Sequence, residues 1–242
     1  MTKLCSLALL GAVLSTSPVF SGPVVVTGDS ITVSYAPHVP NFQSVSLGGL
    51  RAATYVGQTS ASTTNYAQDV VDLNPETIVF MLGTNDSVPT NSTDYRFTLF
   101  KTHVDTAFDL FEQSTASRVI VLSILPADEA AIASTFGNQY GTGMNSRVDD
   151  DYNPWLAAQA AARPKFEYLD LNSAMQSNAN WRRDWLHADG LHLVDGAGEQ
   201  WLANQVSNAV AVPEPSPFLS LSLLGLLWAF RRRITSSPIS SY

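Results

Sequence analysis

The stretch ETIVFMLGTND, residues 76–86, decides the fold of this chain of 242 residues. Its apolar residues follow one another without a polar break and then stop at a glycine, which is typical of a buried strand followed by a turn. Two more stretches share this pattern, PVVVTGDS at residues 23–30 and SRVIVLSILPA at residues 117–127, and KFEYLDLN at residues 165–172 shows it more weakly. Strands that are apolar on both faces indicate a parallel sheet that helices cover on both sides.

Helical spacing of apolar residues occupies the segments between these strands. It covers Asn65–Leu73, Tyr95–Gln113, Asp149–Ala162 and Ala197–Val210. In the second segment, apolar side chains recur at three- and four-residue steps, and we expect them in the core: Phe97, Phe100, Val104, Phe108 and Phe111. The alternation of strands and helices predicts an α/β fold with a mostly parallel sheet between two layers of helices.

Polar residues follow the expected strands at the edge where open parallel sheets bind their ligands. Ser30 is the last residue of the stretch at 23–30, which ends in Gly-Asp-Ser. Asn85 lies in the Gly-Thr-Asn-Asp that ends the stretch at 76–86. A serine hydroxyl becomes a nucleophile when a histidine held by a carboxylate takes its proton, and the oxyanion formed needs N–H donors. Asn85 has a side-chain amide for that role, and Gly48 and Gly49 allow a backbone N–H to approach closely.

The stretch DWLHADGLH, residues 184–192, contains the same spacing of aspartate and histidine twice. The two pairs are Asp184 with His187 and Asp189 with His192. Either histidine is a candidate general base, and a metal site made of both histidines with the aspartates is a third interpretation. A metal site would leave the serine and asparagine stretches without a role, so we expect a general base here and no metal.

These stretches together resemble the SGNH hydrolases, also called the GDSL esterase/lipase family. The four sequence blocks of that family centre on Ser, Gly, Asn and His, and here they read GDSIT, LGGL, GTND and DGLH within residues 22–211. The resemblance implies a flavodoxin-like three-layer α/β/α fold. It also implies hydrolysis of esters through an acyl-serine, without a metal or another cofactor.

The resemblance assigns catalytic roles to three residues. It implies that Ser30 is the nucleophile, that His192 is the general base and that Asp189 orients the histidine. In the family, the catalytic histidine precedes the last helix by a few residues. This favours His192 over His187, which lies five positions earlier.

The resemblance also implies the donors of an oxyanion hole, namely the N–H groups of Ser30 and Gly49 and the side chain of Asn85. Leu50 follows Gly49 where the family usually has a polar residue. Gly48 therefore stays an alternative donor. The short interval between Ser30 and Gly49 predicts a trimmed first crossover and an open site.

The N-terminal segment, residues 1–21, has the composition of a secretory signal peptide. A single basic residue, Lys3, precedes an apolar run, and small residues follow with a cleavage site expected near Ser21 or Gly22. Cys5 is the only cysteine of the chain and lies within this segment. We therefore expect a mature protein without disulfides or cysteine-based metal sites.

The C-terminal segment, residues 212–242, resembles a PEP-CTERM sorting signal. It has the Pro-Glu-Pro motif at residues 213–215, then an apolar stretch and the basic cluster Arg231–Arg233. That resemblance implies transient anchoring in the inner membrane of a Gram-negative-type bacterium and removal of the tail by an exosortase-like protease. We expect the protein at the cell surface or outside the cell.

The chain is acidic, with 13 Lys and Arg, 21 Asp and Glu, and a formal net charge of −8. Without the two end segments it keeps nine basic and twenty acidic residues, a net charge of about −11. Binding of nucleic acid needs basic residues that neutralise phosphates, so we expect no nucleic acid partner. The expected partners are an ester substrate, signal peptidase and an exosortase-like protease.

Two tryptophans near the paired histidines, Trp181 and Trp185, are candidate substrate-binding residues. Indole faces pack on sugar rings, although both side chains could instead form a wall of the core. We expect an exported serine esterase that removes small acyl groups, such as O-acetyl groups of an acylated polysaccharide. The alternatives are a lipid-directed esterase, lysophospholipase or thioesterase, and a non-catalytic surface protein that binds carbohydrate.

Overall fold

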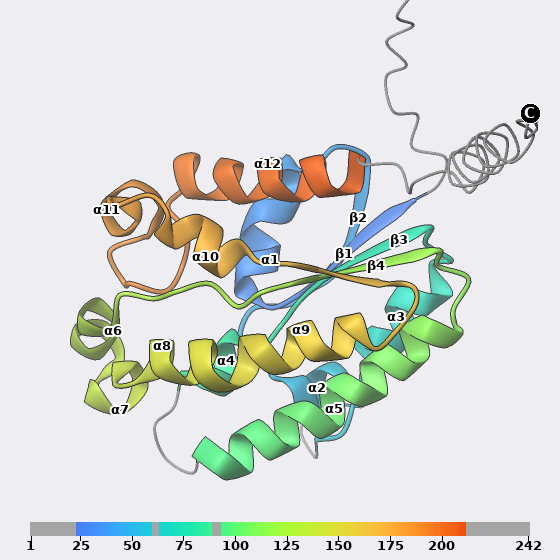
Figure 1. The fold of residues 1–242 in the computed structure, drawn as a ribbon, viewed down its shortest axis with the longest axis horizontal. Coiled ribbons are helices and arrows are strands. Elements are labelled where there is room, and N and C mark those ends of the chain that lie inside the picture. Colours follow the sequence, from blue (N-terminus) through green and yellow to red (C-terminus); the bar gives the residue numbers. More distant parts are fainter. Residues whose placement is uncertain (1–22, 60–62, 89–92, 212–242) are drawn as a thin grey trace, which may run out of the picture. The chain divides into compact units, whose positions relative to one another are not determined.

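A parallel sheet of five strands forms the centre of the computed structural model, which describes residues 23–59, 63–88 and 93–211 (Figure 1). The strands are β1 (Val24–Gly28), β2 (Phe42–Ser46), β3 (Thr77–Met81), β4 (Arg118–Leu122) and β5 (Phe166–Leu169). Their order is β2-β1-β3-β4-β5, and each neighbouring pair is parallel. The described residues up to Val210 form one compact unit. The predicted signal peptide (1–21) and sorting signal (212–242) lie outside the described residues.

Every residue of β1, β3 and β4 is buried, which explains their unbroken apolar sequences. The four strands expected from the sequence are all present. The fifth, β2, was not predicted because FQSVS contains no continuous apolar run. It lies at the edge of the sheet, with Phe42 opposite Val24, and its residues are half-buried or exposed. An edge strand pairs on one side only and needs fewer apolar side chains.

Helices cover both faces of the sheet (Figure 1). Their bounds are α1 (Ser30–Tyr35), α2 (Ala52–Tyr55), α3 (Tyr66–Asp72), α4 (Thr84–Ser87), α5 (Thr93–Gln113), α6 (Glu129–Phe136), α7 (Asn138–Gly141), α8 (Met144–Arg147), α9 (Asn153–Ala161), α10 (Leu171–Gln176), α11 (Trp181–Trp185) and α12 (Ala197–Ala211). A 3-10 turn (Ala36–His38) follows α1, and a π-helical turn (Val148–Tyr152) joins α8 to α9. The four predicted helices correspond to α3, α5, the π turn with α9, and α12.

Two apolar cores lie on the two faces of the sheet. One contains side chains of α2, α3, α5 and α9, including Phe100, Phe108 and Phe111 from the predicted stripe. The other contains side chains of α1, α10, α11 and α12, including Leu202 and Val206. The predicted three-layer α/β/α fold with a parallel sheet is therefore confirmed. None of the helices in the described ranges is both long and apolar enough to cross a bilayer.

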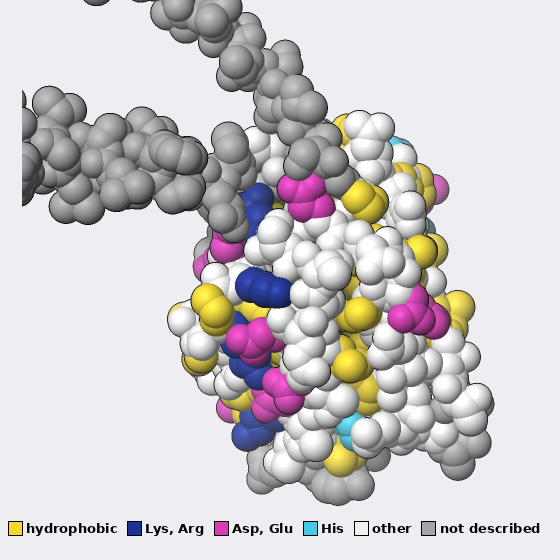
Figure 2. Space-filling view, turned by 90° about the vertical axis from the view of Figure 1, so that its right-hand side faces the viewer, with side chains coloured by type: hydrophobic (Ala, Val, Ile, Leu, Met, Phe, Trp, Pro, Cys, Tyr) yellow, Lys and Arg dark blue, Asp and Glu magenta, His cyan; other side chains and the backbone are white. Residues whose placement is uncertain are grey.

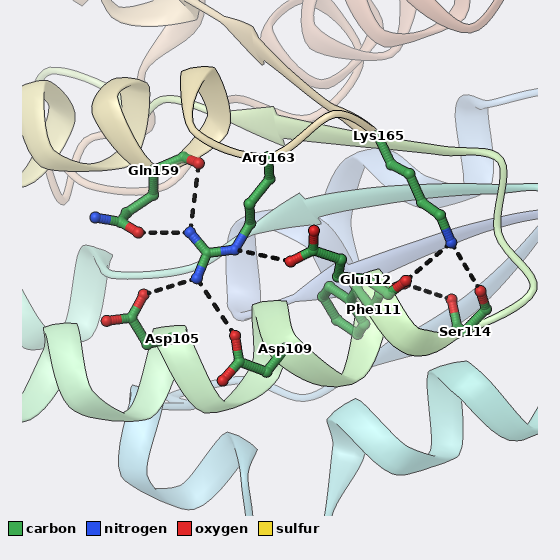
Figure 3. A network of polar contacts seen from close by, with 8 residues as sticks. All are labelled: Asp105, Asp109, Phe111, Glu112, Ser114, Gln159, Arg163 and Lys165. Atoms are coloured by element: carbon green, nitrogen blue, oxygen red, sulfur yellow. Dashed lines mark hydrogen bonds and ion pairs between the residues drawn. The ribbon is translucent and has the colours of Figure 1, made fainter.

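A polar network fastens the segment before β5 to helix α5 (Figure 3). The Arg163 guanidinium lies 3.2 Å from Asp105, 3.4 Å from Asp109 and 3.6 Å from Glu112. The Lys165 ammonium donates to two backbone carbonyls at the end of α5, each at 2.9 Å. Figure 2 shows a similar mixture of acidic and basic side chains on the face seen from the right-hand side of Figure 1. The three carboxylates of this network are exposed, whereas the Arg163 side chain is mostly buried beside α5.

Candidate active site

A tight turn at the end of β1 positions Ser30 as the first residue of α1. Gly28 has a φ of +154°, and a Cβ atom there would lie 1.9 Å from the Met81 carbonyl oxygen. Only glycine allows β1 and β3 to approach this closely. Asp29 is the N-cap of α1, because its carboxylate accepts the Ile31 N–H at 3.1 Å. The sequence Gly-Asp-Ser thus places the serine half-buried at the carboxyl edge of the sheet.

A continuous chain of hydrogen bonds joins Ser30, His192 and Asp189. His192 Nε2 lies 3.0 Å from Ser30 Oγ, and His192 Nδ1 lies 2.7 Å from Asp189 Oδ2. Burial raises the pKa of Asp189, but hydrogen bonds from the His192 side chain and from the backbone N–H groups of His192 and Leu191 outweigh it and lower that pKa to about 2. The Asp189 carboxylate therefore stays ionised beside the imidazole.

The loop that carries His192 is closed at its base and docked on α6. Leu186 and Leu193 form an antiparallel bridge, and the His187 N–H donates to the His192 carbonyl at 2.8 Å. Gly190 has a φ of +77°, and a Cβ atom there would lie 2.5 Å from the Asp128 carbonyl oxygen. The glycine of DGLH therefore lets the loop pack against the start of α6 with His192 turned toward Ser30.

The first Asp-x-x-His pair of the sequence is not formed. Asp184 lies 2.8 Å from the Arg183 guanidinium and 3.3 Å from the Asn178 amide. His187, whose side chain is 57% exposed, instead has its Nδ1 atom 3.4 Å from Asp189 Oδ2. The structure thus brings Asp189 and His192 to the serine, and it leaves His187 at the rim of the same carboxylate.

Asn85 and the two glycines lie beside Ser30. The Asn85 amide donates to the Leu50 carbonyl at 3.0 Å, which fixes the side chain and leaves its second N–H hydrogen available. Gly48 and Gly49 both line the cleft that contains Ser30. A Cβ atom at Gly48 would lie 4.0 Å from Ser30 Cβ, whereas Gly49 has a φ of +74° with open space around it. Both glycines therefore remain candidate donors.

Two further carboxyls, Asp29 and Asp86, are buried next to the site, and no role was predicted for them. Burial raises the pKa of Asp29 to about 6 and that of Asp86 to about 7. Asp86 accepts the Ala52 N–H at 3.2 Å through its carboxylate. Their positions next to Ser30 and Asn85 in the sequence blocks were the signal that could have identified them. They link the two blocks to the backbone of α1 and α2.

A cleft of about 590 Å³ opens at Ser30 and has the size typical of small-molecule sites. Its lining contains both polar and apolar residues, and it is formed by Ser30, Gly48, Gly49, Arg51, Asn85, Val88, Phe136, Tyr140, Leu191 and His192. Phe136 ends α6 and is 44% exposed, and Tyr140 belongs to α7. These aromatic residues were not anticipated, because α6 and α7 are far from the sequence blocks.

Trp181 and Trp185, the candidate substrate-binding residues of the sequence analysis, do not line this cleft. Trp181 is 5% exposed and packs in the core under α12. Trp185 stacks on Trp201 with ring centroids 4.5 Å apart. Trp181 is part of the core that contains α12, and Trp185 packs against that core, so closeness in sequence to His192 did not bring the two rings to the cleft.

The described residues contain no group of three or more His, Cys, Asp or Glu side chains arranged to hold a metal ion. The polar side-chain groups at the cleft are the hydroxyls of Ser30 and Tyr140, an imidazole, an amide and a guanidinium. Together they offer a nucleophile with a base in contact and N–H donors beside it. This arrangement suits acyl transfer to a serine.

Fold and site together define a three-layer α/β/α hydrolase in which a serine after the first strand faces a histidine before the last helix. The chain belongs to the GDSL-like Lipase/Acylhydrolase family, whose model matches residues 26–197. It is therefore an enzyme of the GDSL/SGNH hydrolase type. A comparison with curated protein sequences finds no match.

Several solved structures share the fold. A GDSL-like lipase from Bacteroides thetaiotaomicron has a TM-score of 0.62 and 20% identity, over 81% of this chain and 91% of that one. A lipase/acylhydrolase from Enterococcus faecalis has a TM-score of 0.56 and 18% identity, over 80% and 99% of the two chains. A carbohydrate acetylesterase family member from Sinorhizobium meliloti has a TM-score of 0.50 and 16% identity, over 78% and 96%.

Proposed function

We propose that this protein is an exported serine esterase that hydrolyses small acyl esters, with O-acetyl groups of a polysaccharide as the natural class of substrate. The observation that carries the proposal is the chain of hydrogen bonds from Ser30 through His192 to Asp189, at 3.0 and 2.7 Å. The Ser30 hydroxyl is thus in contact with a base, His192, and that base is in contact with the ionised carboxylate of Asp189.

The reaction starts with attack of Ser30 Oγ on the ester carbonyl carbon, while His192 Nε2 takes the hydroxyl proton. The Nδ1–H of the resulting imidazolium donates to Asp189 Oδ2, which stabilises the positive charge. The oxyanion accepts hydrogen bonds from the Asn85 amide, the Ser30 N–H and the N–H of Gly49 or Gly48.

Collapse of the tetrahedral intermediate breaks the bond to the alcohol, which leaves with the proton from His192. Water then attacks the acyl-serine, and His192 takes a proton from that water and returns one to Ser30 Oγ. The products are a carboxylic acid and an alcohol. The side chain of His192 is 38% exposed, so water can reach the base in the acyl-enzyme.

The cleft supports a small acyl group on a carbohydrate alcohol. Phe136 and Tyr140 offer aromatic surface within the cleft, and such surface packs well on the C–H faces of sugar rings. The fold is shared with a carbohydrate acetylesterase family member from Sinorhizobium meliloti. Export follows from the expected signal peptide and sorting signal, and determination of the mature N- and C-termini by mass spectrometry tests it.

A lipid-directed esterase is the second candidate, and the apolar lining favours it. Val88, Phe136 and Leu191 form an apolar part of the cleft that can accept an acyl chain. Nitrophenyl esters of increasing chain length separate the candidates. A rate that is highest for acetate and falls with length supports the small-acyl esterase, whereas an optimum at eight carbons or more supports the lipid enzyme.

The test of the catalytic assignment is covalent labelling with a fluorophosphonate, followed by mapping of the modified residue by mass spectrometry. We expect a single label on Ser30 and loss of both label and nitrophenyl acetate turnover in Ser30→Ala. Modification elsewhere, with Ser30 untouched in an active preparation, would contradict the assignment.

A further inference from the structure

Arg51 is the one Lys or Arg side chain among the described residues that line the cleft. Asp and Glu side chains are absent from the same described lining. Within the described residues, no side chain makes a hydrogen bond or ion pair with the exposed Arg51 guanidinium, although its charge acts on the buried Asp86 carboxyl and partly offsets the rise in pKa that burial causes there. In a chain of net charge −8, this is a local positive site next to the serine.

The backbone on both sides of Arg51 is fastened to the Gly-Thr-Asn-Asp block. The Leu50 carbonyl accepts the Asn85 amide at 3.0 Å, and the Ala52 N–H donates to the Asp86 carboxylate at 3.2 Å. Arg51 itself is the N-cap residue of α2, and its carbonyl accepts the Tyr55 N–H at 2.9 Å. The start of the Arg51 side chain is therefore held in a constant position relative to Asn85.

We propose that Arg51 recognises a carboxylate on the alcohol part of the substrate, so that the preferred substrates are acyl esters of acidic sugar units such as uronates. This inference rests on the proposed esterase function and names its substrate class. A guanidinium donates two parallel hydrogen bonds to a planar carboxylate, and such pairs are stronger and more specific than neutral ones. One guanidinium balances the single charge of a carboxylate, whereas a phosphate dianion carries a second charge for which the described lining offers no cation.

The cleft offers a charged group and an aromatic surface, and a sugar unit with a carboxylate can contact both. Arg51 comes from the N-terminus of α2, whereas Phe136 and Tyr140 come from α6 and α7. A uronate ring can place its carboxylate on the guanidinium and its C–H face on an aromatic ring while its acyl ester points to Ser30. A neutral sugar would leave the guanidinium without a partner and gain less from the cleft.

The experiment compares two matched substrates, methyl 2-O-acetyl-glucuronoside and methyl 2-O-acetyl-glucoside, with nitrophenyl acetate as a check on the catalytic machinery. We expect kcat/KM of the unchanged protein to favour the glucuronoside by about 3- to 5-fold, the effect expected of an ion pair that stays accessible to solvent. The preference should fall as NaCl is raised, because an exposed ion pair is screened.

The variants are Arg51→Gln, which removes the charge, and Arg51→Lys, which keeps the charge but loses the paired geometry. In Arg51→Gln we expect the ratio of the two kcat/KM values to approach one, mainly through a higher KM for the glucuronoside. Arg51→Lys should fall between the two. Arg183→Gln is the matched control, since Arg183 is 74% exposed and paired with Asp184, and it should keep the ratio.

Equal kcat/KM values for the two glycosides, with active nitrophenyl acetate turnover, would overturn the inference and leave the esterase function standing. Absence of all turnover would overturn both. Acetylated glycerol 3-phosphate serves as a third substrate. A preference for this phosphate over the glucuronoside that depends on Arg51 would show that the site selects phosphate and contradict the carboxylate assignment.

Discussion

Asp189 holds His192 by its side chain and by its backbone at the same time: Oδ2 lies 2.7 Å from His192 Nδ1, and Oδ1 accepts the His192 N–H at 2.9 Å. One carboxylate thus orients the ring and fixes the turn that carries it. A carboxylate three residues before the histidine can do both, because an Asx-type turn closes over that interval. This explains why the second Asp-x-x-His unit serves the site.

Substitution of the two histidines separates their roles. His192→Ala should lower kcat by about 10⁴-fold or more, since the serine loses its base. His187→Ala should stay within about threefold of the unchanged protein, because the His187 ring is mostly exposed and its Nδ1 is 3.4 Å from Asp189. Nitrophenyl acetate hydrolysis measures both, and the reverse order of effects would refute the assignment.

Removal of the Asn85 side chain should weaken stabilisation of the oxyanion. We expect Asn85→Ala to lower kcat by about 10²- to 10³-fold, the usual cost of losing one donor of this kind. Ser87→Ala is the control on the same short helix, because the Ser87 hydroxyl donates only to the Thr84 carbonyl among the described contacts. A decrease of equal size in both variants would indicate a general disturbance of α4 and not the loss of a donor.

Because burial raises the pKa of two carboxyls, Asp29 and Asp86, we expect the protein to lose stability as the pH rises. Burial raises the pKa of Asp29 to about 6 and of Asp86 to about 7, whereas an unfolded aspartate has about 3.9. The folded state therefore holds more protons between about pH 4 and 7, and the free energy of unfolding falls across that range by up to about 1.4 kcal/mol per pH unit for each group.

Urea unfolding at pH 5 and pH 8 measures this effect. Asp86→Asn keeps an oxygen for the Ala52 N–H and should show a smaller difference between the two pH values than the unchanged protein. Asp189 acts in the opposite sense, since its pKa is lowered to about 2, and its contribution is lost as the pH falls from about 4 toward 2. An equal pH dependence in the variant would show that Asp86 is not the source.

Substitution of Gly28 should destabilise the fold. An alanine Cβ would lie 1.9 Å from the Met81 carbonyl oxygen, and this is backbone of a central strand that has little room to move. We expect Gly28→Ala to lower the free energy of unfolding by about 3 kcal/mol or more. Gly196→Ala is the control, because Gly196 has a φ of +81° in open space and should cost only about 1–2 kcal/mol. Similar losses in both would contradict the steric explanation.

Substitution of Phe136 and of Trp185 tests which of these aromatic residues acts in the cleft and which in the core. Phe136→Ala should raise KM for nitrophenyl esters severalfold with a small change in stability, since Phe136 lines the cleft and is 44% exposed. Trp185→Ala should instead lower the melting temperature, because Trp185 stacks on Trp201, and leave KM close to its original value. A KM effect for Trp185→Ala without loss of stability would restore that residue as a substrate contact.

Much of the architecture could be predicted from the local pattern of apolar residues. The strands β1, β3 and β4 have unbroken apolar sequences, and the long helix α5 has helical spacing, because each element must bury its own surface. β2 was not predicted, because the residues of this edge strand are half-buried or exposed and do not form an apolar run. The short helices α6 to α8 were not predicted, because a repeat at three- and four-residue steps needs longer segments than these helices have.

The sequence by itself determined the fold class, the four strands β1, β3, β4 and β5, and the family blocks that contain Ser30, Asn85 and His192. The tertiary structure supplied the distances that join Asp189 and His192 to Ser30, and it alone decided that Trp181 is in the core and that Arg51 lies in the cleft. The physical reason is that periodicity and motifs report interactions between near neighbours. The contents of a site depend on how loops from different strands dock at one edge of the sheet.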